Sequence, residues 1–455
     1  MNSCNYYSNY TCHSCSTIET DYSSQIELKE HHLDSLIDAN LKYTPTLYTT
    51  VHSRPWHFRN KAKMIVAGNS RKPIIGIVRQ EDTGHKGRGN SPLDRAMQSR
   101  RYHQQQFSSQ AAFGSGPLSG NSYRARNDQP ELFHHKKFTS SDPFQVHEIL
   151  SCPLHTQVLN RVIKSLKYII SKYQIHPYNI AKRSGELKAL IIFASEFSDN
   201  NNSEDEMYLR FVLRSKNEID KIKSAMPEIM EKFPSIKVIT ANIQPVAHAV
   251  LEGDEEIYLT EEKFIKDKMG DFLLTITPGT FYQTNPRVAH RLYEAAQKIV
   301  YSIDPDTLWD MYCGVGAFSL YCANDVRKKI VAVEASAKSI ECAKINQTAY
   351  NLTSKIDFIR SNAEDFLRDR MEQQSPDVMI VNPPRKGLSS DMLSMILSKK
   401  YKIRDIIYSS CNAETLFRDI RDLEQFYRVK SLQIFDMFPH THHYETLAYL
   451  VAKHA

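Results

Sequence analysis

Two residues in the C-terminal half of this 455-residue sequence have the chemistry of a nucleophile and a proton acceptor. Cys411 follows the apolar run Asp405–Ser410, so we expect its thiol at the carboxyl end of a buried strand. A helix that begins just after it would lower the thiol pKa. Glu445 precedes a second apolar run, where its carboxylate can reach the same pocket. The pair indicates covalent catalysis with a general base, and the alternatives are a structural cysteine and a solvated acid.

A glycine pair after another predicted strand suits the close approach of a nucleotide-like ligand. Gly314 and Gly316 are separated by one residue, and Glu334 lies twenty residues beyond Gly314. An acid at that distance can bind ribose hydroxyls. Ser319 stands where a dinucleotide fingerprint has its third glycine, which disfavours NAD and favours S-adenosylmethionine (SAM). A tight turn in an ordinary α/β sheet is the structural alternative.

A further strand candidate ends in Asn382-Pro383-Pro384-Arg385. The two prolines fix the backbone where the strand leaves the sheet. Asn382 can therefore present its amide and carbonyl groups to a planar substrate or to the amine of a cofactor. Asn-Pro-Pro recurs in SAM-dependent methyltransferases of nucleic acids and amino groups, so it favours SAM as the ligand.

These residues must be positioned by the alternating strands and helices that follow residue 277. Apolar runs predict strands at Leu308–Tyr312, Ile330–Glu334, Ile356–Arg360, Val378–Asn382 and Asp405–Ser410. Helical spacing lies between them, including Ser336–Tyr350 with Ser336 as its N-cap. The alternation predicts an α/β domain over residues 278–455, a doubly wound Rossmann-like sheet with ligands at the carboxyl ends of its strands.

The preceding sequence predicts a central α+β domain over residues 49–277, after an N-terminal segment of residues 1–48. Its predicted strands are Met64–Val66, Pro73–Val78, Leu187–Ala194, Met207–Leu213, Ile236–Ile243 and Phe272–Ile276, and its helices are Val158–Tyr173 and Glu218–Phe233. From about residue 80 to 146 the chain is rich in Gly, Ser, Gln, Asn and Arg and shows no structural period. We expect a disordered insertion there.

Four of the eight cysteines have the spacing of a metal centre. Cys4, Cys12 and Cys15 form a C-x7-C-x2-C group, and Cys152 can supply a fourth thiolate from a distance. Four thiolates suit a tetrahedral zinc ion or a [4Fe–4S] cluster, and the spacing alone leaves both open. Reactive thiols on a flexible tail are the alternative.

Composition and charge narrow the class of protein. The sequence has no apolar run of about 18 residues and no signal-peptide pattern, so we expect a cytoplasmic protein without a membrane anchor. The net charge of +6 is a weak pointer to an anionic partner, because nine basic and six acidic residues of the insertion account for half of it. We expect the three histidines of the segment His440–His443 to face solvent or RNA rather than a metal. If the anionic partner is RNA, basic and aromatic side chains of one segment are its expected contacts: Trp56, Phe58, Arg59, Lys61 and Lys63.

Together these segments resemble the RNA uracil-5-methyltransferases, in particular the branch that acts on bacterial 23S ribosomal RNA. The resembling stretches are F-R-N-K-A-K-M at Phe58–Met64, N-I-Q-P-V at Asn242–Val246, E-I-Y-L-T-E at Glu256–Glu261, F-Y-Q-T-N-P at Phe281–Pro286, Y-C-G-V-G at Tyr312–Gly316, V-N-P-P-R at Val381–Arg385, Y-S-S-C-N-A at Tyr408–Ala413 and F-D-M-F-P-H-T at Phe435–Thr441. They cover nearly the whole chain outside residues 80–146.

The resemblance implies a function and a role for each candidate residue. It implies methyl transfer from SAM to C5 of a specific uridine in 23S ribosomal RNA, with Cys411 as the nucleophile that adds to C6 and Glu445 as the base. SAM would be bound by Gln283, Tyr312, Glu334 and Asn382, and a [4Fe–4S] cluster by Cys4, Cys12, Cys15 and Cys152. No obligate protein partner is implied. The alternatives are a different uridine in 23S RNA or tRNA, and a non-catalytic iron–sulfur factor that binds RNA.

Overall fold

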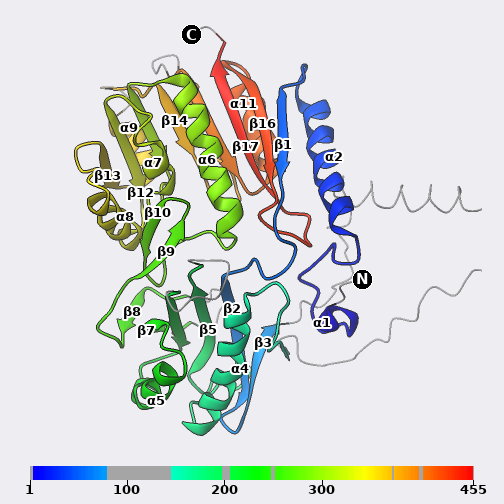
Figure 1. The fold of residues 1–455 in the computed structure, drawn as a ribbon, viewed down its shortest axis with the longest axis vertical. Coiled ribbons are helices and arrows are strands. Elements are labelled where there is room, and N and C mark those ends of the chain that lie inside the picture. The colour runs from blue at the N-terminus through cyan, green and yellow to red at the C-terminus, as the bar shows by residue number, and fades with distance from the viewer. Residues whose placement is uncertain are drawn as a thin grey trace, which may run out of the picture. The chain divides into compact units, whose positions relative to one another are not determined.

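The structure is a computed structural model in which the chain forms two large β-sheets and a two-stranded one (Figure 1). It describes residues 4–78, 145–196, 205–246, 252–370, 374–398 and 403–453. The predicted insertion therefore lies outside the described residues, apart from its last two positions. A four-residue helix, α1 (Asn5–Ser8), opens the described part of the chain.

The larger sheet has eight strands and contains all the strands predicted after residue 277. Its order is β1 (Thr46–Val51), β16 (Tyr427–Phe435), β17 (Glu445–Ala452), β15 (Asp405–Ser410), β14 (Val378–Val381), β11 (Thr307–Met311), β12 (Lys329–Glu334) and β13 (Ile356–Arg360). Strand β17 runs antiparallel to both of its neighbours, and the other pairs are parallel. The predicted doubly wound α/β domain is confirmed.

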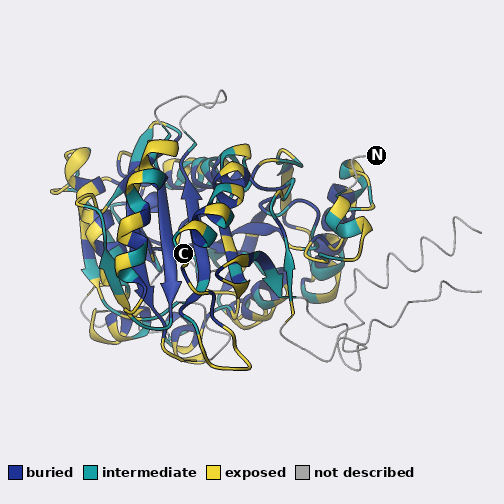
Figure 2. Ribbon diagram, turned by 90° about the horizontal axis from the view of Figure 1, so that it is seen from below, coloured by how far each residue is buried: buried dark blue, intermediate teal, exposed yellow. Residues whose placement is uncertain are grey.

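Helices cover both faces of this sheet, which explains the nearly continuous apolar strands. Strand β11 illustrates the burial of both faces, because Leu308 packs into the core on one side of the sheet and Trp309 into the core on the other. One side carries α6 (Pro286–Ile303), α7 (Ala317–Cys322) and α8 (Ala337–Ala349). The other side carries α2 (Tyr22–Asn40), α9 (Ala363–Arg370), α10 (Ser390–Ile396) and α11 (Ala413–Leu423). Figure 2 shows the strands buried and the outward faces of the helices exposed.

Strand β1 completes this sheet and helix α2 covers part of one face, although both come from the N-terminal part of the sequence. Neither element was predicted. Strand β1 pairs in parallel with β16, and Leu47 lies opposite Leu432. Helix α2 lies beside β1 (Figure 1), and its Leu33 and Ile37 pack into the same core as α11. Residues 22–51 thus belong structurally to the C-terminal sheet.

Helix α2 also holds the loop of residues 436–444, which leads into β17. The buried ammonium of Lys29 lies 2.6 Å from a carboxylate oxygen of Asp436, and burial lowers the pKa of this lysine. The hydroxyl of Tyr22 donates to the other oxygen of Asp436 at 2.6 Å. His32 pairs with the hydroxyl of Tyr444 at 2.8 Å. Three turns of one helix therefore fix the loop that places Glu445.

The second sheet has seven strands and forms the central domain. Its order is β4 (Val146–Glu148), β3 (Lys72–Val78), β2 (Lys61–Asn69), β5 (Leu187–Ala194), β6 (Met207–Leu213), β7 (Ile236–Ile243) and β8 (Glu255–Tyr258). Only β6 and β7 pair in parallel, joined by α5 (Ile219–Lys232). Helix α5 and α4 (Gln157–Lys172) share its core. The hairpin β9 (Ile265–Met269) and β10 (Phe272–Ile276) reaches α8, where Asn346 accepts the amide N–H of Thr275 at 2.6 Å.

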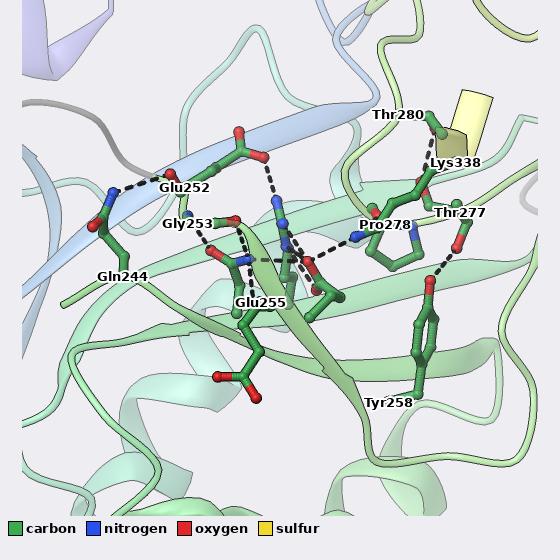
Figure 3. Close-up of polar contacts among 12 residues, drawn as sticks. Gln244, Glu252, Gly253, Glu255, Tyr258, Thr277, Pro278, Thr280 and Lys338 are labelled. Atoms are coloured by element: carbon green, nitrogen blue, oxygen red, sulfur yellow. Dashed lines mark hydrogen bonds and ion pairs between the residues drawn. The ribbon is translucent and has the colours of Figure 1, made fainter. Parts of the chain in front are cut away.

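A buried ionic network links the central sheet to α8 (Figure 3). Arg210 on β6, with 3% of its side chain exposed, forms a bidentate pair with Glu256 on β8 and a second pair with Glu252. Glu256 also accepts from the side-chain amide of Asn242 at 3.1 Å and lies 3.3 Å from the ammonium of Lys338 on α8. Two of the resembling stretches, Asn242–Val246 and Glu256–Glu261, are therefore joined by the hydrogen bond between Asn242 and Glu256.

We expect Glu256→Gln to lower the free energy of unfolding by about 3 kcal/mol, because it removes a charge partner of a buried guanidinium. Glu255→Gln is the matched control. The carboxylate of Glu255 pairs with Lys216 at the surface, where both side chains are at least half exposed, and such pairs contribute less than about 1 kcal/mol. Urea unfolding of both variants measures the difference. Equal losses would show that the network contributes no more than a surface ion pair.

Within the described ranges, no helix combines the length and hydropathy that crossing a membrane requires.

Candidate active site

The predicted catalytic and ligand-binding residues converge at the edge of the eight-stranded sheet that is formed by the carboxyl ends of its parallel strands. Strands β12, β11, β14, β15 and β17 are consecutive neighbours in it. At this edge lie Glu334, Tyr312, Asn382 and Cys411, which end or directly follow four parallel strands, and Glu445, which begins the antiparallel β17. With a strand spacing of about 4.8 Å, the ends of β12 and β15 are roughly 14 Å apart. An extended ligand can therefore reach from Glu334 toward Cys411.

Cys411 lies between the end of β15 and the start of α11, as predicted, but its pKa does not follow the prediction. Burial raises the pKa of this thiol, and the nearby carboxylate of Glu445 raises it further. Arg385, which follows the prolines of the Asn-Pro-Pro segment, hydrogen-bonds the thiol and opposes both effects. The expectation that the helix N-terminus would leave the pKa below its ordinary value is therefore wrong, because burial outweighs it. The sequence analysis did not assign this role to Arg385.

Glu445 is a buried carboxyl group poised to exchange a proton near neutral pH. Only 2% of it is exposed, and burial raises its pKa to about 7. The hydroxyl of Ser409 on β15 donates to its Oε1 at 2.6 Å and opposes this rise. In the β15–β17 pairing, Ser410 lies opposite Thr446, which brings Cys411 and Glu445 to adjoining positions. A solvated acid at a strand end is thereby excluded.

We expect Ser409→Ala to move the pH midpoint of turnover upward by roughly one unit. The hydroxyl stabilises the charged form of Glu445, so its removal raises the pKa of that carboxyl. Ser410→Ala is the matched control, because the Ser410 hydroxyl donates to the backbone carbonyl of Asn412 at 3.0 Å instead. Rate measurements from pH 5.5 to 9 distinguish the two variants. An unchanged midpoint in Ser409→Ala would refute this assignment.

The glycine loop after β11 has the geometry to admit a ligand. Glu334 accepts the amide N–H of Gly314 at 3.2 Å and that of Ser336 at 2.8 Å, so one carboxylate joins the loop to the start of α8. Gly314 has a φ of +57° and open space where a side chain would stand. Tyr312 adopts a φ of +63° and directs its hydroxyl toward Glu364 at 3.4 Å. The predicted cap of α8 is confirmed, because the Ser336 hydroxyl accepts the amide N–H of Ser339.

The segment of residues 277–285, between β10 and α6, carries Gln283 and spans the same edge. At one end, the Pro278 carbonyl lies 3.5 Å from the ammonium of Lys338 (Figure 3). At the other, the Asn285 side chain donates to the Met437 carbonyl in the loop before β17 at 3.3 Å. Gln283 is buried, whereas Phe281 is 69% exposed. The sequence analysis missed Phe281, although it lies within one of the resembling stretches.

The four candidate metal ligands lie apart from this edge, near one another. The thiols of Cys4, Cys12 and Cys152 all act electrostatically on Cys15, whose pKa burial raises to about 12. No three His, Cys, Asp or Glu side chains in the described ranges are arranged around a point that could hold a single metal ion. The guanidinium of Arg59 lies beside this group, and burial lowers its pKa while the thiols of Cys152 and Cys15 raise it.

Of the predicted RNA contacts, Phe58 is wrong, and three of the others have protein partners. Phe58 is 4% exposed and packs against Cys15 and Leu154, so it cannot meet RNA. Arg59 faces thiols, and its Nε donates to the Lys61 carbonyl at 3.0 Å. Burial lowers the pKa of Lys61 to about 8, and the exposed Lys63 pairs with Glu252 at 2.6 Å.

The prediction for the histidines is also wrong at one position. His440 is 3% exposed and stacks its ring on Trp56, with ring centroids 4.1 Å apart. Its two ring nitrogens lie 3.1 Å from the side-chain nitrogen of Gln25 and 2.8 Å from the Pro55 carbonyl. His443 is exposed, as expected.

The sheet order with a single antiparallel strand, the glycine loop, and the acid after the next strand together define a methyltransferase-type α/β fold. A solved structure shares it: Pyrococcus abyssi tRNA (uracil-54, C5)-methyltransferase in complex with S-adenosyl-L-homocysteine, with a TM-score of 0.65 and 22% identity over 96% of this chain and 85% of that one.

Residues 216–453 match the model of the tRNA (uracil-5-)-methyltransferase family. The 23S rRNA (uracil(747)-C(5))-methyltransferase RlmC of Xenorhabdus bovienii is 34% identical over 98% of both chains. The protein of the same name from Salmonella typhimurium is 33% identical over 98% of both. The chain belongs to the RNA uracil-5-methyltransferase family.

Proposed function

We propose that this protein transfers a methyl group from SAM to C5 of uridine 747 in 23S ribosomal RNA, the reaction named for its relatives. The observation that carries the proposal is the pairing of Cys411 with a buried carboxyl, Glu445, whose pKa is about 7. The substrate also makes the cytoplasm the expected place of action.

The chemistry follows from the electronics of uracil, whose C5 is a poor nucleophile. The Cys411 thiolate, favoured by Arg385, adds to C6 and pushes electrons toward C5. A bound SAM would supply the methyl group, with its methyl–sulfur bond breaking as C5 takes the group and S-adenosylhomocysteine leaving. The Glu445 carboxylate removes the C5 proton, and the resulting elimination breaks the C6–sulfur bond and restores the thiolate. The target base must leave its stack to reach Cys411.

The residues proposed to hold SAM are Gln283, Tyr312, Glu334 and Asn382. The open space above Gly314 supports this assignment, because a ligand can approach the backbone there. Glu334 is also fixed by two backbone amides, so its carboxylate is held in place before any ligand binds.

We also propose that Cys4, Cys12, Cys15 and Cys152 bind a [4Fe–4S] cluster. Arg59 supports this, because its positively charged guanidinium lies beside the thiols of Cys152 and Cys15. A thiolate-bound cluster is anionic and would compensate that charge. Methyl transfer needs no electron, so we assign the cluster a structural role. Iron and sulfide analysis of anaerobically purified protein tests it, and stoichiometric zinc without iron would refute it.

The reaction itself is tested with radiolabelled SAM and three transcripts: a 23S fragment with uridine 747, the same fragment with cytidine there, and tRNA. We expect label in the first alone. Label in the tRNA transcript would favour the substrate class that the matching family model names. A protein that binds all three and labels none would be a non-catalytic RNA-binding factor.

A further inference from the structure

A cavity of about 1120 Å³ lies outside the methyl-transfer site, between the N-terminal segment, Trp56 and His440. Its lining includes none of the residues proposed for the reaction and only one of the four cysteines. Six aromatic rings line it: Tyr7, Tyr10, His13, Tyr22, Trp56 and His440. No lysine or arginine is among its described lining residues, so it does not suit a phosphate.

Two of these six rings, His440 and Trp56, are held in place before any ligand binds. His440 holds a left-handed φ of +63°, and three hydrogen bonds to Gln25 and Pro55 fix its backbone amide and both ring nitrogens. Trp56 stacks on this fixed ring with an interplanar angle of 31°. Tyr10 also has a left-handed φ, +55°, and its side chain is 64% exposed. Such backbone strain in residues other than glycine concentrates at functional sites.

The aromatic rings and the carboxylate of Glu19 indicate which kind of ligand the cavity would bind. Unpaired RNA bases stack on aromatic side chains, and their edges are read by hydrogen bonds. Glu19 lines the cavity, is exposed and has no hydrogen-bond or ion-pair partner among the described residues. A carboxylate accepts from the exocyclic amino group of cytosine, adenine or guanine, which uracil lacks.

We propose that this cavity binds an unpaired, amino-bearing base of the substrate RNA, a second base site besides the one at Cys411. The proposal rests on the proposed function. The buried His440, which stacks against the ring of Trp56, lies five residues before Glu445 in the loop that α2 holds, so a base stacked on Trp56 fixes the RNA relative to the catalytic carboxyl. The site positions the RNA and takes no part in the chemistry.

Tryptophan fluorescence tests the proposal directly, because the chain has two tryptophans and Trp309 is 2% exposed in the core. Titration with oligocytidylate should quench the emission, and oligouridylate of equal length should quench it less. Trp56→Phe should remove the change. Equal quenching by both oligomers would overturn the preference for an amino group, and RNA binding without quenching would overturn the site.

Three variants separate this site from the catalytic one. Tyr10→Asn keeps a residue that tolerates left-handed backbone and removes the ring, and we expect about tenfold weaker binding of the 23S fragment. Tyr301→Ala, in α6 and 73% exposed, is the matched control and should bind as the wild type does. Glu19→Leu should abolish the preference for oligocytidylate, because leucine has no hydrogen-bond acceptor. Methylation of the 23S fragment with unchanged affinity in Tyr10→Asn would overturn this site and leave the proposed function intact. Absence of methylation by the wild type would refute the proposed function, whereas the oligomer titrations test the cavity separately.

Discussion

Cys411→Ala is expected to abolish methylation, with a rate loss of roughly four orders of magnitude or more, the scale seen when an enzyme loses its nucleophile. The variant lacks the sulfur that adds to C6, so C5 never gains the electron density to take a methyl group. SAM binding should persist, because its proposed ligands lie on other strands and in the segment before α6. Radiolabel transfer and calorimetric titration with SAM measure the two properties.

The covalent step has its own readout in RNA that carries 5-fluorouridine at the target. Fluorine cannot leave C5 as a proton would, so the wild type should form an adduct that survives denaturing electrophoresis. Cys411→Ala should form none. Substantial methylation by this variant would sink the mechanism, and an adduct in the variant would assign the nucleophile to another residue.

Glu445→Gln is expected to stop the reaction after methyl transfer and to lower turnover by about 10²- to 10⁴-fold. Glutamine fills the same space and can keep the hydrogen bond from Ser409, but it cannot accept the C5 proton. A methylated protein–RNA adduct should therefore accumulate on unmodified RNA. Gel electrophoresis with methyl-labelled SAM detects it, and wild-type turnover without such an adduct would assign the base elsewhere.

The same substitution should also make Cys411 more reactive in the absence of RNA. The Glu445 carboxylate raises the pKa of the thiol, so its loss lowers that pKa and increases the thiolate fraction at a given pH. Iodoacetamide should modify Cys411 faster in Glu445→Gln than in the wild type above pH 7, where Glu445 is charged. For the same reason, wild-type turnover should rise with pH through about 7, because only the ionised carboxyl accepts a proton.

Strands with strong local patterns could be predicted from the sequence to the residue. Asp405–Ser410 is buried throughout, whereas Ile356–Arg360 has buried residues only at its first and third positions, and both match their predicted bounds. The convergence of Cys411 and Glu445 also matched the prediction, because β17 runs antiparallel to β15 and therefore begins beside the carboxyl end of β15. The sequence does not show how deeply Cys411 is buried. The effect of burial on the thiol pKa could therefore not be compared with that of the helix N-terminus, and the predicted direction of the shift was wrong.

Helix α2 and strand β1 escaped prediction because their signals are not local. The buried face of α2 carries Gln25, Lys29 and His32, so it shows no continuous apolar stripe. The partners that make this polar face stable belong to the loop before β17. Strand β1 is exposed over its first four residues, and only its pairing with β16 makes it a strand. The burial of the His440 ring also escaped prediction, because its partners Gln25 and Pro55 are distant in the sequence.

The contact of Lys29 with Asp436 joins residues 407 positions apart, and it constrains when the enzyme can become active. During synthesis, α2 and β1 leave the ribosome long before β16, β17 and the loop between them exist. The polar face of α2 stays exposed to water, and β1 stays unpaired, until residues 427–452 have been synthesised. Long-range closure of this kind is slow relative to local folding. Glu445, the proposed base, is placed only after these segments have met, and we expect a nascent chain that lacks residues 427–452 to be inactive.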